Sequence, residues 1–522
     1  MKNTIITITT LLCSLHAVAQ APLSHLQMVW QRNIGGMANE YVGGFEQLSS
    51  GDYLLSTTTF SDSTAIFNCG ISPQYAGQQG MKMMLSILDS NGNFAQHLCV
   101  PAKMYSFSGG ITNTNDGGFA ITGQSPTLYY PGFSELDAYI GKFDANYNLT
   151  WQGTMYASGG GGDFGINITQ LYDSSLAAVG YTKSKNNANY PFLVAGKSAP
   201  YYINMIPDTS RNALYNRRCP PNSLGGDATA IKQINDSTVA IMGTQDAGSI
   251  NTSIMFATMN LKATQVTHHY YGGGLTESGT SFVVTPNGDY ILTSVSSSND
   301  SIVQNHSSGF TDGFVLRINP QGQLIWKKCY GNIRYDYIFK ILADPKNNGE
   351  YYMLGQYDRP PEVPGGPGAV MAWIMKIDGS TGALLWEEFI DGVGLEGFYN
   401  GMIDRDGDLV AVGVTSCNPT QQPNSGGYDA WVVKFKDLRV DEKPVPPAAN
   451  TWQITPMPSN CYKVRFAGDG LRYPIALTLT DATGKQIKQL SATSSETIID
   501  LSSYAQGIYF LSSPLGAKKL LR

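Results

Sequence analysis

Charged residues are scarce in this sequence. Asp, Glu, Lys and Arg make up 14% of its 522 residues, whereas an average soluble protein contains roughly 25%. The formal net charge of −6 is spread along the chain without a basic patch, which argues against a nucleic acid as partner. The apolar fraction is ordinary at 42%, so the shortage of charge does not indicate disorder. Together with 57 glycines, this composition favours an exported all-β protein with many tight turns.

The motifs of several enzyme classes are also missing. The sequence has no Gly-x-Ser-x-Gly motif of serine hydrolases and no His-Glu-x-x-His motif of zinc proteases. The adjacent residues His268 and His269 would point to opposite faces of a strand, so they do not make a simple metal site. A carboxylate pair for glycoside hydrolysis stays open, because such a pair is defined in space and not in sequence. We therefore predict no catalytic residue, no cofactor and no metal.

No Cys-x-x-Cys spacing occurs, which argues against a zinc or redox site. Six cysteines follow the N-terminal segment, and an exported protein meets an oxidising environment in which disulfides form. Cys69 and Cys99 fall within one sequence repeat, and we predict a disulfide between them. Buried free thiols are the alternative.

The first 19 residues have the features of a secretory signal peptide. Lys2 supplies the positive start, residues 4–15 are mostly apolar, and Ala17-Val18-Ala19 fits the small-x-small rule for cleavage. Cys13 permits a lipoprotein as the alternative. No later segment approaches the ~18 apolar residues of a membrane span. We predict a signal peptide at residues 1–19 and no transmembrane span.

An internal repeat organises residues 27–435. Four segments share a strand pattern of β-branched and aromatic residues; they are 137–144, 312–319, 372–378 and 429–435. Each is preceded by a hairpin turn between two apolar strands, often of the Asn-Gly or Asp-Gly type. Seven such turns, roughly 60 residues apart, are centred on Gly51, Gly117, Ser174, Ser237, Gly288, Gly349 and Gly407.

Four short strands per repeat, recurring seven times, predict a seven-bladed β-propeller. The last repeat stops after its third strand, whereas residues 28–31 at the start of the chain resemble an unmatched fourth strand. We therefore predict that the N-terminal strand completes the seventh blade, which removes two exposed sheet edges. An array of two-sheet sandwiches or a solenoid is the alternative.

One acidic segment resembles part of a calcium-binding loop. Asp404, Asp406 and Asp408 alternate with other residues, and carboxylate oxygens are ligands that Ca²⁺ prefers. A complete loop would need further oxygen ligands and a terminal carboxylate. Because Asp406-Gly407 also fits the hairpin turn of the repeat, we assign this segment to a turn and not to a metal site.

The long loops all occur at the second connection of a repeat, and thus on one face of a propeller. Loops on a rigid scaffold are where function concentrates, and exposed aromatic rings stack on sugars or anchor proteins. We therefore predict a ligand surface on this face. Its expected residues are Tyr75, Tyr129, Tyr130, Phe133, Tyr190, Tyr357 and Arg359. For any one of them, a ring that covers a blade edge is the alternative.

The composition changes after residue 435. Residues 436–450 are a Pro-containing linker, and residues 451–522 are β-rich without the repeat. This last stretch resembles the type A sorting domain of type IX secretion cargo in the order, spacing and position of its motifs, although Met457 stands where Asn is usual. The matching residues are Pro456, Pro458, Asp481, Gly484, Lys485, Gly507, Tyr509, Lys518 and Lys519.

The resemblance implies a small Ig-like β-sandwich that addresses the chain to the type IX secretion machinery. Such domains are typically cleaved, and the mature protein is released or anchored at the cell surface. An ordinary Ig-like binding module is the alternative. The repeat region resembles the propeller-repeat proteins common among such cargo, a likeness of architecture that carries no active-site residues across.

The sequence therefore predicts a secreted or cell-surface protein that binds or adheres through its propeller loops. The ligand would be a glycan or a surface protein. The alternative is a secreted hydrolase or lyase that degrades polysaccharide, with its active site at the propeller channel. A structural part of an outer-membrane assembly is a third reading.

Overall fold

A computed structural model of the chain shows an all-β protein. It describes residues 25–522 except for 37, 62–80, 103–104, 127–135, 156–161, 184–198, 206–215, 219–225, 247–250, 305–309, 361–368, 391–393, 417–426, 439–450, 458–459, 468–472 and 514. The predicted signal peptide at residues 1–19 thus lies outside the described residues. Within those described, no helix has the length and apolar character needed to cross a membrane. The chain divides after residue 438 into two compact units, which are described separately.

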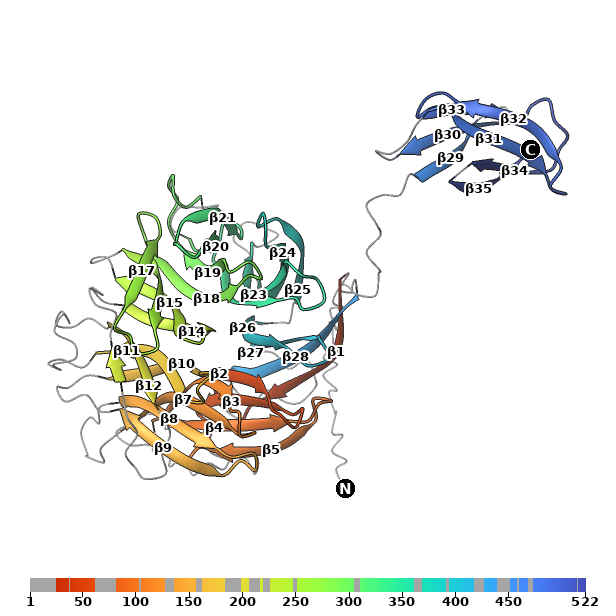
Figure 1. Ribbon diagram of the computed structural model, residues 1–522. Coiled ribbons are helices and arrows are strands. Elements are labelled where there is room, and N and C mark those ends of the chain that lie inside the picture. Colours follow the sequence, from red (N-terminus) through yellow and green to blue (C-terminus); the bar gives the residue numbers. More distant parts are fainter. Residues whose placement is uncertain are drawn as a thin grey trace, which may run out of the picture. The chain divides into compact units, whose positions relative to one another are not determined.

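The first unit consists of seven four-stranded antiparallel sheets (Figure 1). Sheet 1 is β2 (Glu40–Gln47), β3 (Tyr53–Thr59), β4 (Lys82–Leu88) and β5 (Phe94–Cys99); sheet 2 is β6 (Phe107–Asn113), β7 (Phe119–Pro126), β8 (Leu136–Phe143) and β9 (Leu149–Met155); sheet 3 is β10 (Asp163–Gln170), β11 (Leu176–Thr182), β12 (Ala199–Met205) and β13 (Asn216–Arg218).

The remaining sheets follow the same order of strands. Sheet 4 is β14 (Gly226–Asn235), β15 (Thr238–Asp246), β16 (Thr252–Asn260) and β17 (Val266–Tyr271); sheet 5 is β18 (Glu277–Val284), β19 (Tyr290–Ser296), β20 (Asp312–Ile318) and β21 (Leu324–Tyr330); sheet 6 is β22 (Tyr337–Ala343), β23 (Glu350–Arg359), β24 (Ala369–Asp378) and β25 (Leu384–Ile390); sheet 7 is β26 (Glu396–Ile403), β27 (Leu409–Thr415), β28 (Asp429–Asp437) and β1 (Leu26–Ile34).

Sheet 7 joins the two ends of this unit. The N-terminal strand β1 pairs with β28 in an antiparallel register that places Trp30 opposite Lys434 and Asn33 opposite Trp431. The indole nitrogen of Trp431 donates a hydrogen bond to Gln31 Oε1 at 3.0 Å. The N-terminal strand and the last three strands of the unit thus share one sheet.

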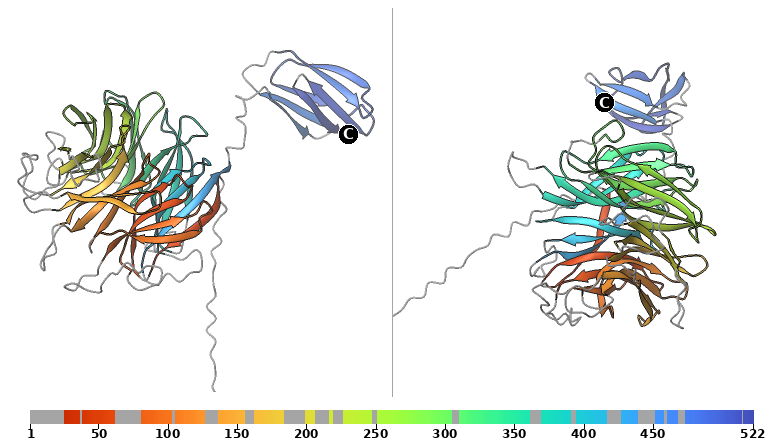
Figure 2. Two further views of the ribbon diagram at one scale, coloured as in Figure 1. Left: turned by 60° about the horizontal axis from the view of Figure 1, so that its bottom comes forward. Right: turned by 90° about the vertical axis from the view of Figure 1, so that its left-hand side faces the viewer.

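The sheets form a propeller-like arrangement. The first strand of each sheet contacts the first strand of the next, and β26 of sheet 7 contacts β2 of sheet 1, so that the contacts form a closed cycle. Figures 1 and 2 show the seven sheets side by side around this cycle. The core lies between successive sheets, where both faces of the inner strands are buried.

The burial of single strands reflects this packing. Every residue of β3 and of β27 is buried, as expected for strands covered on both faces. One core cluster joins Ile291 and Val315 of sheet 5 to Ile338, Met353 and Trp373 of sheet 6. Each such side chain contributes roughly 1.5–3 kcal/mol through its burial.

The predicted hairpin turns begin at the expected places. Six of the seven centres have positive φ, which those turn types require; they are Gly51, Gly117, Ser174, Gly288, Gly349 and Gly407. The seventh turn is a two-residue connection, since Asn235 lies opposite Thr238. The turns lie at one end of the unit, opposite to the end from which the second connections emerge.

A basic residue near the end of the third strand pairs with an acid of the hairpin turn in four sheets. The pairs are Lys142 Nζ–Asp116 Oδ2 at 2.8 Å, Arg317 Nη2–Asp289 Oδ2 at 2.7 Å, Lys376 Nζ–Asp344 Oδ2 at 2.5 Å and Lys434 Nζ–Asp404 Oδ2 at 2.8 Å. Because each pair spans the turn and the strand, it holds the turn against its own sheet.

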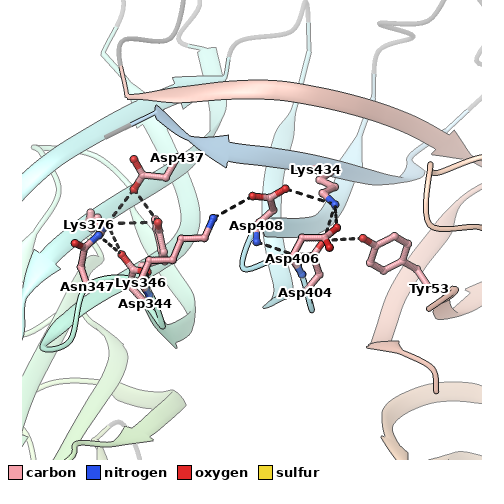
Figure 3. A network of polar contacts seen from close by, with 11 residues as sticks. Tyr53, Asp344, Lys346, Asn347, Lys376, Asp404, Asp406, Asp408, Lys434 and Asp437 are labelled. Atoms are coloured by element: carbon pink, nitrogen blue, oxygen red, sulfur yellow. Dashed lines mark hydrogen bonds and ion pairs between the residues drawn. The ribbon is translucent and has the colours of Figure 1, made fainter. Parts of the chain in front are cut away.

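The pair of Lys376 also holds neighbouring sheets together. The side chain of Lys376 is fully buried, and its ammonium group contacts Asp437 of sheet 7 at 2.9 Å in addition to Asp344. Beside it, the Tyr53 hydroxyl of sheet 1 donates a hydrogen bond to Asp404 of sheet 7 at 2.8 Å. Figure 3 shows that these contacts form one network across sheets 6, 7 and 1.

The second unit has two antiparallel sheets that share one core. One sheet is β29 (Thr451–Met457), β30 (Cys461–Ala467) and β33 (Glu496–Asp500); the other is β32 (Gln486–Ala492), β31 (Ile475–Asp481), β34 (Ile508–Ser513) and β35 (Gly516–Leu521). Trp452 and Phe466 of the first sheet pack with Leu477 and Leu511 of the second.

Buried carboxyl groups stand where sheets 7 and 1, and sheets 5 and 6, meet. Glu40, at the start of β2, is fully buried and accepts hydrogen bonds from the hydroxyls of Thr59 and Ser61. Burial raises the pKa of Glu40 to about 7, with a further rise from Asp429 of sheet 7. Burial also raises the pKa of Asp429 to about 6 and that of Asp336 to about 7.

We predict that replacing Lys376 by Ala lowers the free energy of unfolding by about 3–5 kcal/mol, because buried carboxylates lose their counter-charge. Urea unfolding of the mature chain measures this change. Lys262→Ala, at an exposed turn, is the matched control and should change the free energy by less than about 0.5 kcal/mol. A loss for Lys376→Ala as small as that of the control would contradict the prediction.

We also predict that the first unit becomes less stable as the pH rises from about 5 to about 8. Glu40, Asp429 and Asp336 bind a proton more tightly in the folded chain than in the unfolded chain, where such pKa values are near 4. Their stabilisation is therefore present below about pH 4 and is lost as the pH rises through about 6 and 7. Urea unfolding across this range measures the trend.

Asp429→Asn should weaken this pH dependence, whereas Asp236→Asn, at an exposed turn, should leave it unchanged. A free energy of unfolding that rises between about pH 5 and about pH 8 would count against the assignment.

Candidate functional site

Five aromatic residues at one end of the first unit form a cluster. Tyr41 lies in β2, Tyr337 and Phe339 in β22, Tyr399 in β26, and Tyr428 directly before β28. The ring centroids of Phe339 and Tyr399 are 4.9 Å apart in an edge arrangement, and those of Tyr337 and Phe339 are 5.7 Å apart and stacked. We call these five residues the aromatic cluster.

The other tyrosines of the cluster act on the ionisation of Tyr399. Burial raises the pKa of Tyr399 to about 12, with smaller upward contributions from Tyr428, Tyr337 and Tyr41. At neutral pH the Tyr399 hydroxyl is therefore protonated, and it donates a hydrogen bond to Gln356 Oε1 at 3.3 Å. Tyr41 keeps 46% of its surface exposed. The cluster thus offers both ring faces and hydroxyl groups to a ligand.

The backbone explains why two of these rings leave the core. In β22 and β26 the register shifts by one residue directly after Ile338 and after Phe398, which are both fully buried between sheets. The extra residues are Phe339 and Tyr399. A β-bulge re-aims the side chain of its extra residue, so these two rings are turned away from the sheet-to-sheet core.

The aromatic cluster lies on the side predicted for the ligand surface. In sheets 1 and 7 the first residue of the first strand is opposite the last residue of the second strand: Glu40 pairs with Thr59, and Glu396 with Thr415. Members of the cluster on first strands stand within the first four residues of those strands. The cluster therefore lies at the end of the unit from which the second connections emerge.

Three charged residues further along the first strands influence one another electrostatically. They are Glu46 in β2, Lys232 in β14 and Lys340 in β22, and we call them the central charged cluster. The charges of both lysines act to lower the pKa of Glu46, and the charge of Glu46 acts to raise the pKa of each lysine. These influences oppose the larger effect of burial. Because their strands belong to sheets 1, 4 and 6, which are not neighbours in the cycle, these charges act on one another across its centre.

Burial has the largest influence on all three groups. It raises the pKa of Glu46 to about 7, lowers that of Lys232 to about 8 and lowers that of Lys340. All three side chains nevertheless keep solvent-exposed surface. Both observations fit side chains that project into a narrow hydrated space enclosed by protein. Titratable groups shifted toward neutrality are typical of functional sites.

The central charged cluster limits the chemistry available at the centre. Glycoside hydrolysis by paired carboxylates needs two carboxyl groups within about 10 Å. Among the described residues of the seven first strands, Glu46 is the one acidic residue that stands beyond the second position of its strand. These strands therefore bring no second carboxylate to Glu46. One carboxylate with two ammonium groups is suited to binding an anion or to moving a proton.

The structure gives the position of only some predicted ligand residues. Tyr357 lies in β23 and not in a loop as predicted, because β23 continues to residue 359, and its ring is 5.4 Å from that of Trp373 and 4.6 Å from that of Phe389. Arg359 is exposed at the end of β23. Outside the described residues lie Tyr75, Tyr129, Tyr130, Phe133 and Tyr190.

The two clusters were not predicted from the sequence. All their members except Tyr428 lie within strands, whereas the sequence reasoning considered loop residues. The available signal was an aromatic residue directly after a core residue at the same place in two repeats, as in Ile338-Phe339 and Phe398-Tyr399. Only the bulge that separates these neighbours shows which ring is free to meet a ligand.

The acidic turn at Asp404, Asp406 and Asp408 contains a cation of its own. The carboxylates of this turn lie within 4.8 Å of one another, and Lys434 Nζ contacts all three at 2.8, 3.0 and 3.5 Å (Figure 3). The ammonium group thus occupies the position that a metal ion would need, and ion pairing accounts for this turn. 

The predicted disulfide is described at one of its ends. Cys99 is disulfide-bonded, whereas Cys69 lies outside the described residues. The pairing of Cys69 with Cys99 therefore stays a prediction. Among the described residues, Cys329 and Cys461 carry thiol groups and are not part of a disulfide.

The sorting-domain residues lie at turns and strands of the second unit. Asp481 Oδ1 accepts hydrogen bonds from the backbone N–H groups of Thr483 and Lys485, and Gly484 completes this turn with a φ of 84°. The buried Tyr509 donates a hydrogen bond to the Ala505 carbonyl at 2.8 Å.

The remaining matched residues lie near the edges of the two sheets. Gly507 pairs with Arg522 through two backbone hydrogen bonds, and Lys518 and Lys519 are exposed on β35. Pro456 lies in β29, opposite Tyr462. Pro458 lies outside the described residues.

The fold thus defines an all-β protein of repeated four-stranded sheets, followed by a small β-unit of different construction. Residues 456–520 of that unit match the family of secretion system C-terminal sorting domains. The chain therefore carries a type IX secretion sorting domain, is addressed to the type IX secretion machinery, and is exported to the cell surface or secreted. No curated protein matches the sequence.

Several solved structures resemble the chain in fold at low identity. A protein of unknown function from Dyadobacter fermentans is 10% identical, with a TM-score of 0.43 over 80% of this chain and 100% of that chain. Kuenenia stuttgartiensis hydrazine synthase is 12% identical, with a TM-score of 0.41 over 71% of this chain and 92% of that chain. NanB sialidase from Streptococcus pneumoniae is 10% identical, with a TM-score of 0.37 over 80% and 71%.

We predict that residues 436–522 suffice to export a periplasmic reporter in a strain with type IX secretion. The sorting domain has its own core, so it can fold behind an unrelated protein. Fractionation of the culture measures the reporter at the cell surface or in the medium. A reporter extended by residues 436–450 alone is the control and should stay in the periplasm. Retention of both fusions would contradict the prediction.

Proposed function

We propose that this protein is a secreted or cell-surface binding protein whose first unit is a seven-bladed β-propeller. The seven sheets and the closed cycle of contacts between their first strands support this architecture. The second unit is proposed to be an Ig-like β-sandwich that serves export. A signal peptide at residues 1–19 would bring the chain across the inner membrane first.

The ligand that we propose is a glycan, bound at the end of the propeller that carries the aromatic cluster. The observation that supports this choice is the convergence of Tyr41, Phe339 and Tyr399 from three different sheets. Aromatic rings supply large apolar area at low entropic cost, and the phenol hydroxyls supply hydrogen bonds. Sugar rings, with apolar faces and hydroxyl edges, complement such a surface.

The ligand residues predicted from the sequence would extend this surface, five of them from loops and two from the end of β23. They are Tyr75, Tyr129, Tyr130, Phe133, Tyr190, Tyr357 and Arg359. The second connections that carry most of them emerge at the end of the unit where the aromatic cluster lies. A ligand held by the cluster would therefore lie within reach of these loops.

The alternative function is degradation of polysaccharide at the centre of the propeller. It is favoured by the pKa of Glu46 near 7 and that of Lys232 near 8, because general acids and bases work best near the operating pH. Shortened saccharides released by the mature chain, but not by a Glu46→Gln variant, would establish this alternative.

We predict that Tyr41→Ala and Tyr399→Ala each weaken glycan binding by about tenfold, as expected for loss of a stacked aromatic ring. A glycan array probed with the mature chain identifies the ligand, and calorimetry measures each affinity. Tyr172→Ala removes a ring that is 63% exposed at a hairpin turn, at the other end of the unit, and should leave the affinity unchanged. Thermal unfolding confirms that each variant is folded. Unchanged affinity in both cluster variants would exclude the proposed site.

A further inference from the structure

Beyond their first two positions, the seven first strands carry more positive than negative charge. Acidic residues occur in the seven first strands at the first or second position, near the aromatic end; they are Glu40, Asp163, Asp227, Glu277 and Glu396. Further along these strands the charged residues are Glu46, Lys232 and Lys340 alone. The central charged cluster therefore holds two positive charges and one negative charge.

The two lysines of this cluster have no direct partner within the described part of the chain. Neither Lys232 nor Lys340 forms a hydrogen bond or an ion pair there, and the Lys232 ammonium group lies 6.0 Å from the centroid of the Phe282 ring. Lys376 and Lys434, by contrast, are each enclosed by carboxylates. An ammonium group without a counter-charge can form charge-assisted hydrogen bonds with an oxyanion, so such a pair of lysines is suited to receive an anionic group.

Within the described residues, no direct contact joins the three side chains of the cluster. The three side chains come from sheets 1, 4 and 6 and interact through their charges without forming an ion pair. The aromatic cluster lies near the first residues of β2 and β22, the strands that carry Glu46 and Lys340. From Tyr337 to Lys340 the distance along β22 is roughly 10 Å, at ~3.3 Å per residue. One or two sugar units span that distance.

We propose that Lys232 and Lys340 bind an acidic substituent of the glycan, a carboxylate or a sulfate, while the aromatic cluster holds neighbouring sugar rings. This inference rests on the proposed function and names the class of ligand, an acidic polysaccharide. Ammonium groups form charge-assisted hydrogen bonds with both kinds of oxyanion. The aromatic cluster supplies affinity for the sugar chain, and the lysines select sugar chains that carry an acidic group.

Glu46 makes this selection depend on pH. The charged groups that act on its carboxyl group are Lys340 and Lys232, and the corresponding residues of the neighbouring strands β6 and β26 are the uncharged Thr112 and Met402. As the pH falls through the pKa of Glu46, about 7, its negative charge is lost and the net charge of the cluster rises. Above about 8, the pKa of Lys232, one positive charge is lost. The affinity for an acidic glycan therefore increases as the pH falls.

The experiment compares three oligosaccharides of equal length by calorimetry with the mature full-length chain. An oligogalacturonate carries carboxylates, a sulfated dextran oligosaccharide carries sulfates, and an unmodified dextran oligosaccharide carries no charge. Lys232→Gln and Lys340→Gln should each weaken binding of the preferred acidic probe by roughly tenfold and leave binding of the neutral probe unchanged. Lys262→Gln, an exposed lysine at a turn, should alter neither.

The pH dependence gives a second measurement. The acidic probe should bind several-fold more tightly at about pH 6 than at about pH 8, and Glu46→Gln should remove most of this difference. The carboxylate and sulfate arms identify which oxyanion the site prefers. Salt should weaken binding of the acidic probe far more than that of the neutral probe.

The outcomes separate this inference from the proposed function. If the neutral probe binds as tightly as both acidic probes and the lysine variants change nothing, the inference is wrong, while sensitivity of the same binding to Tyr399→Ala preserves the glycan site. If none of the three probes binds, the proposed function itself is overturned. If the lysine variants are unfolded, the salt and pH responses of the unaltered chain decide the matter, and their absence overturns the inference.

Discussion

Antiparallel pairing between β1 and β28 is the constraint on which the rest of the first unit depends. It completes sheet 7 from both ends of the unit and brings β2 of sheet 1 against β26 of sheet 7. Across that joint, Asn400 Nδ2 donates a hydrogen bond to the Gly43 carbonyl at 3.2 Å, and Arg405 donates to the Leu48 carbonyl at 2.7 Å. Without the pairing, sheets 1 and 7 would each expose an apolar face, and Tyr41 would have no reason to lie near Tyr399.

Four lysines of the first unit show two different uses of one residue type. Lys376 and Lys434 are surrounded by carboxylates of the hairpin turns, so their charges stabilise the joints between sheets 6, 7 and 1. Lys232 and Lys340 lie at the centre, where a single Glu46 acts on both. A protein interior tolerates the first arrangement because each charge is matched. The second arrangement leaves a surplus of charge that a ligand can match, which is why we place selectivity at the centre and stability at the turns.

Much of the repeat could be predicted because its signals are local. A turn such as Asp406-Gly407 needs positive φ, and Gly adopts positive φ whatever the surrounding structure is. An apolar run such as β27 is buried on both faces in any close-packed arrangement of sheets. The pairing of the N-terminal strand could be predicted as well, because residues 28–31 have the pattern of a missing fourth strand. The aromatic and central charged clusters could not be predicted in this way. Phe339 follows the buried Ile338, and in a regular strand its side chain would point to the opposite face of the same sheet. The bulge that turns the Phe339 ring out of the core depends on the register between β22 and β23.

The sequence alone determined the all-β class, the recurring turns and strands, the joining of the two ends, and the C-terminal sorting domain, because each of these follows from residues close together in the chain or from a motif order. Only the tertiary structure decided which residues from different repeats meet. Tyr41 and Tyr399 are far apart along the chain, as are Glu46 and Lys340, and no local preference specifies such distances. They become neighbours because seven similar sheets pack face to face and their first strands close into a cycle. The candidate site is a product of that closure.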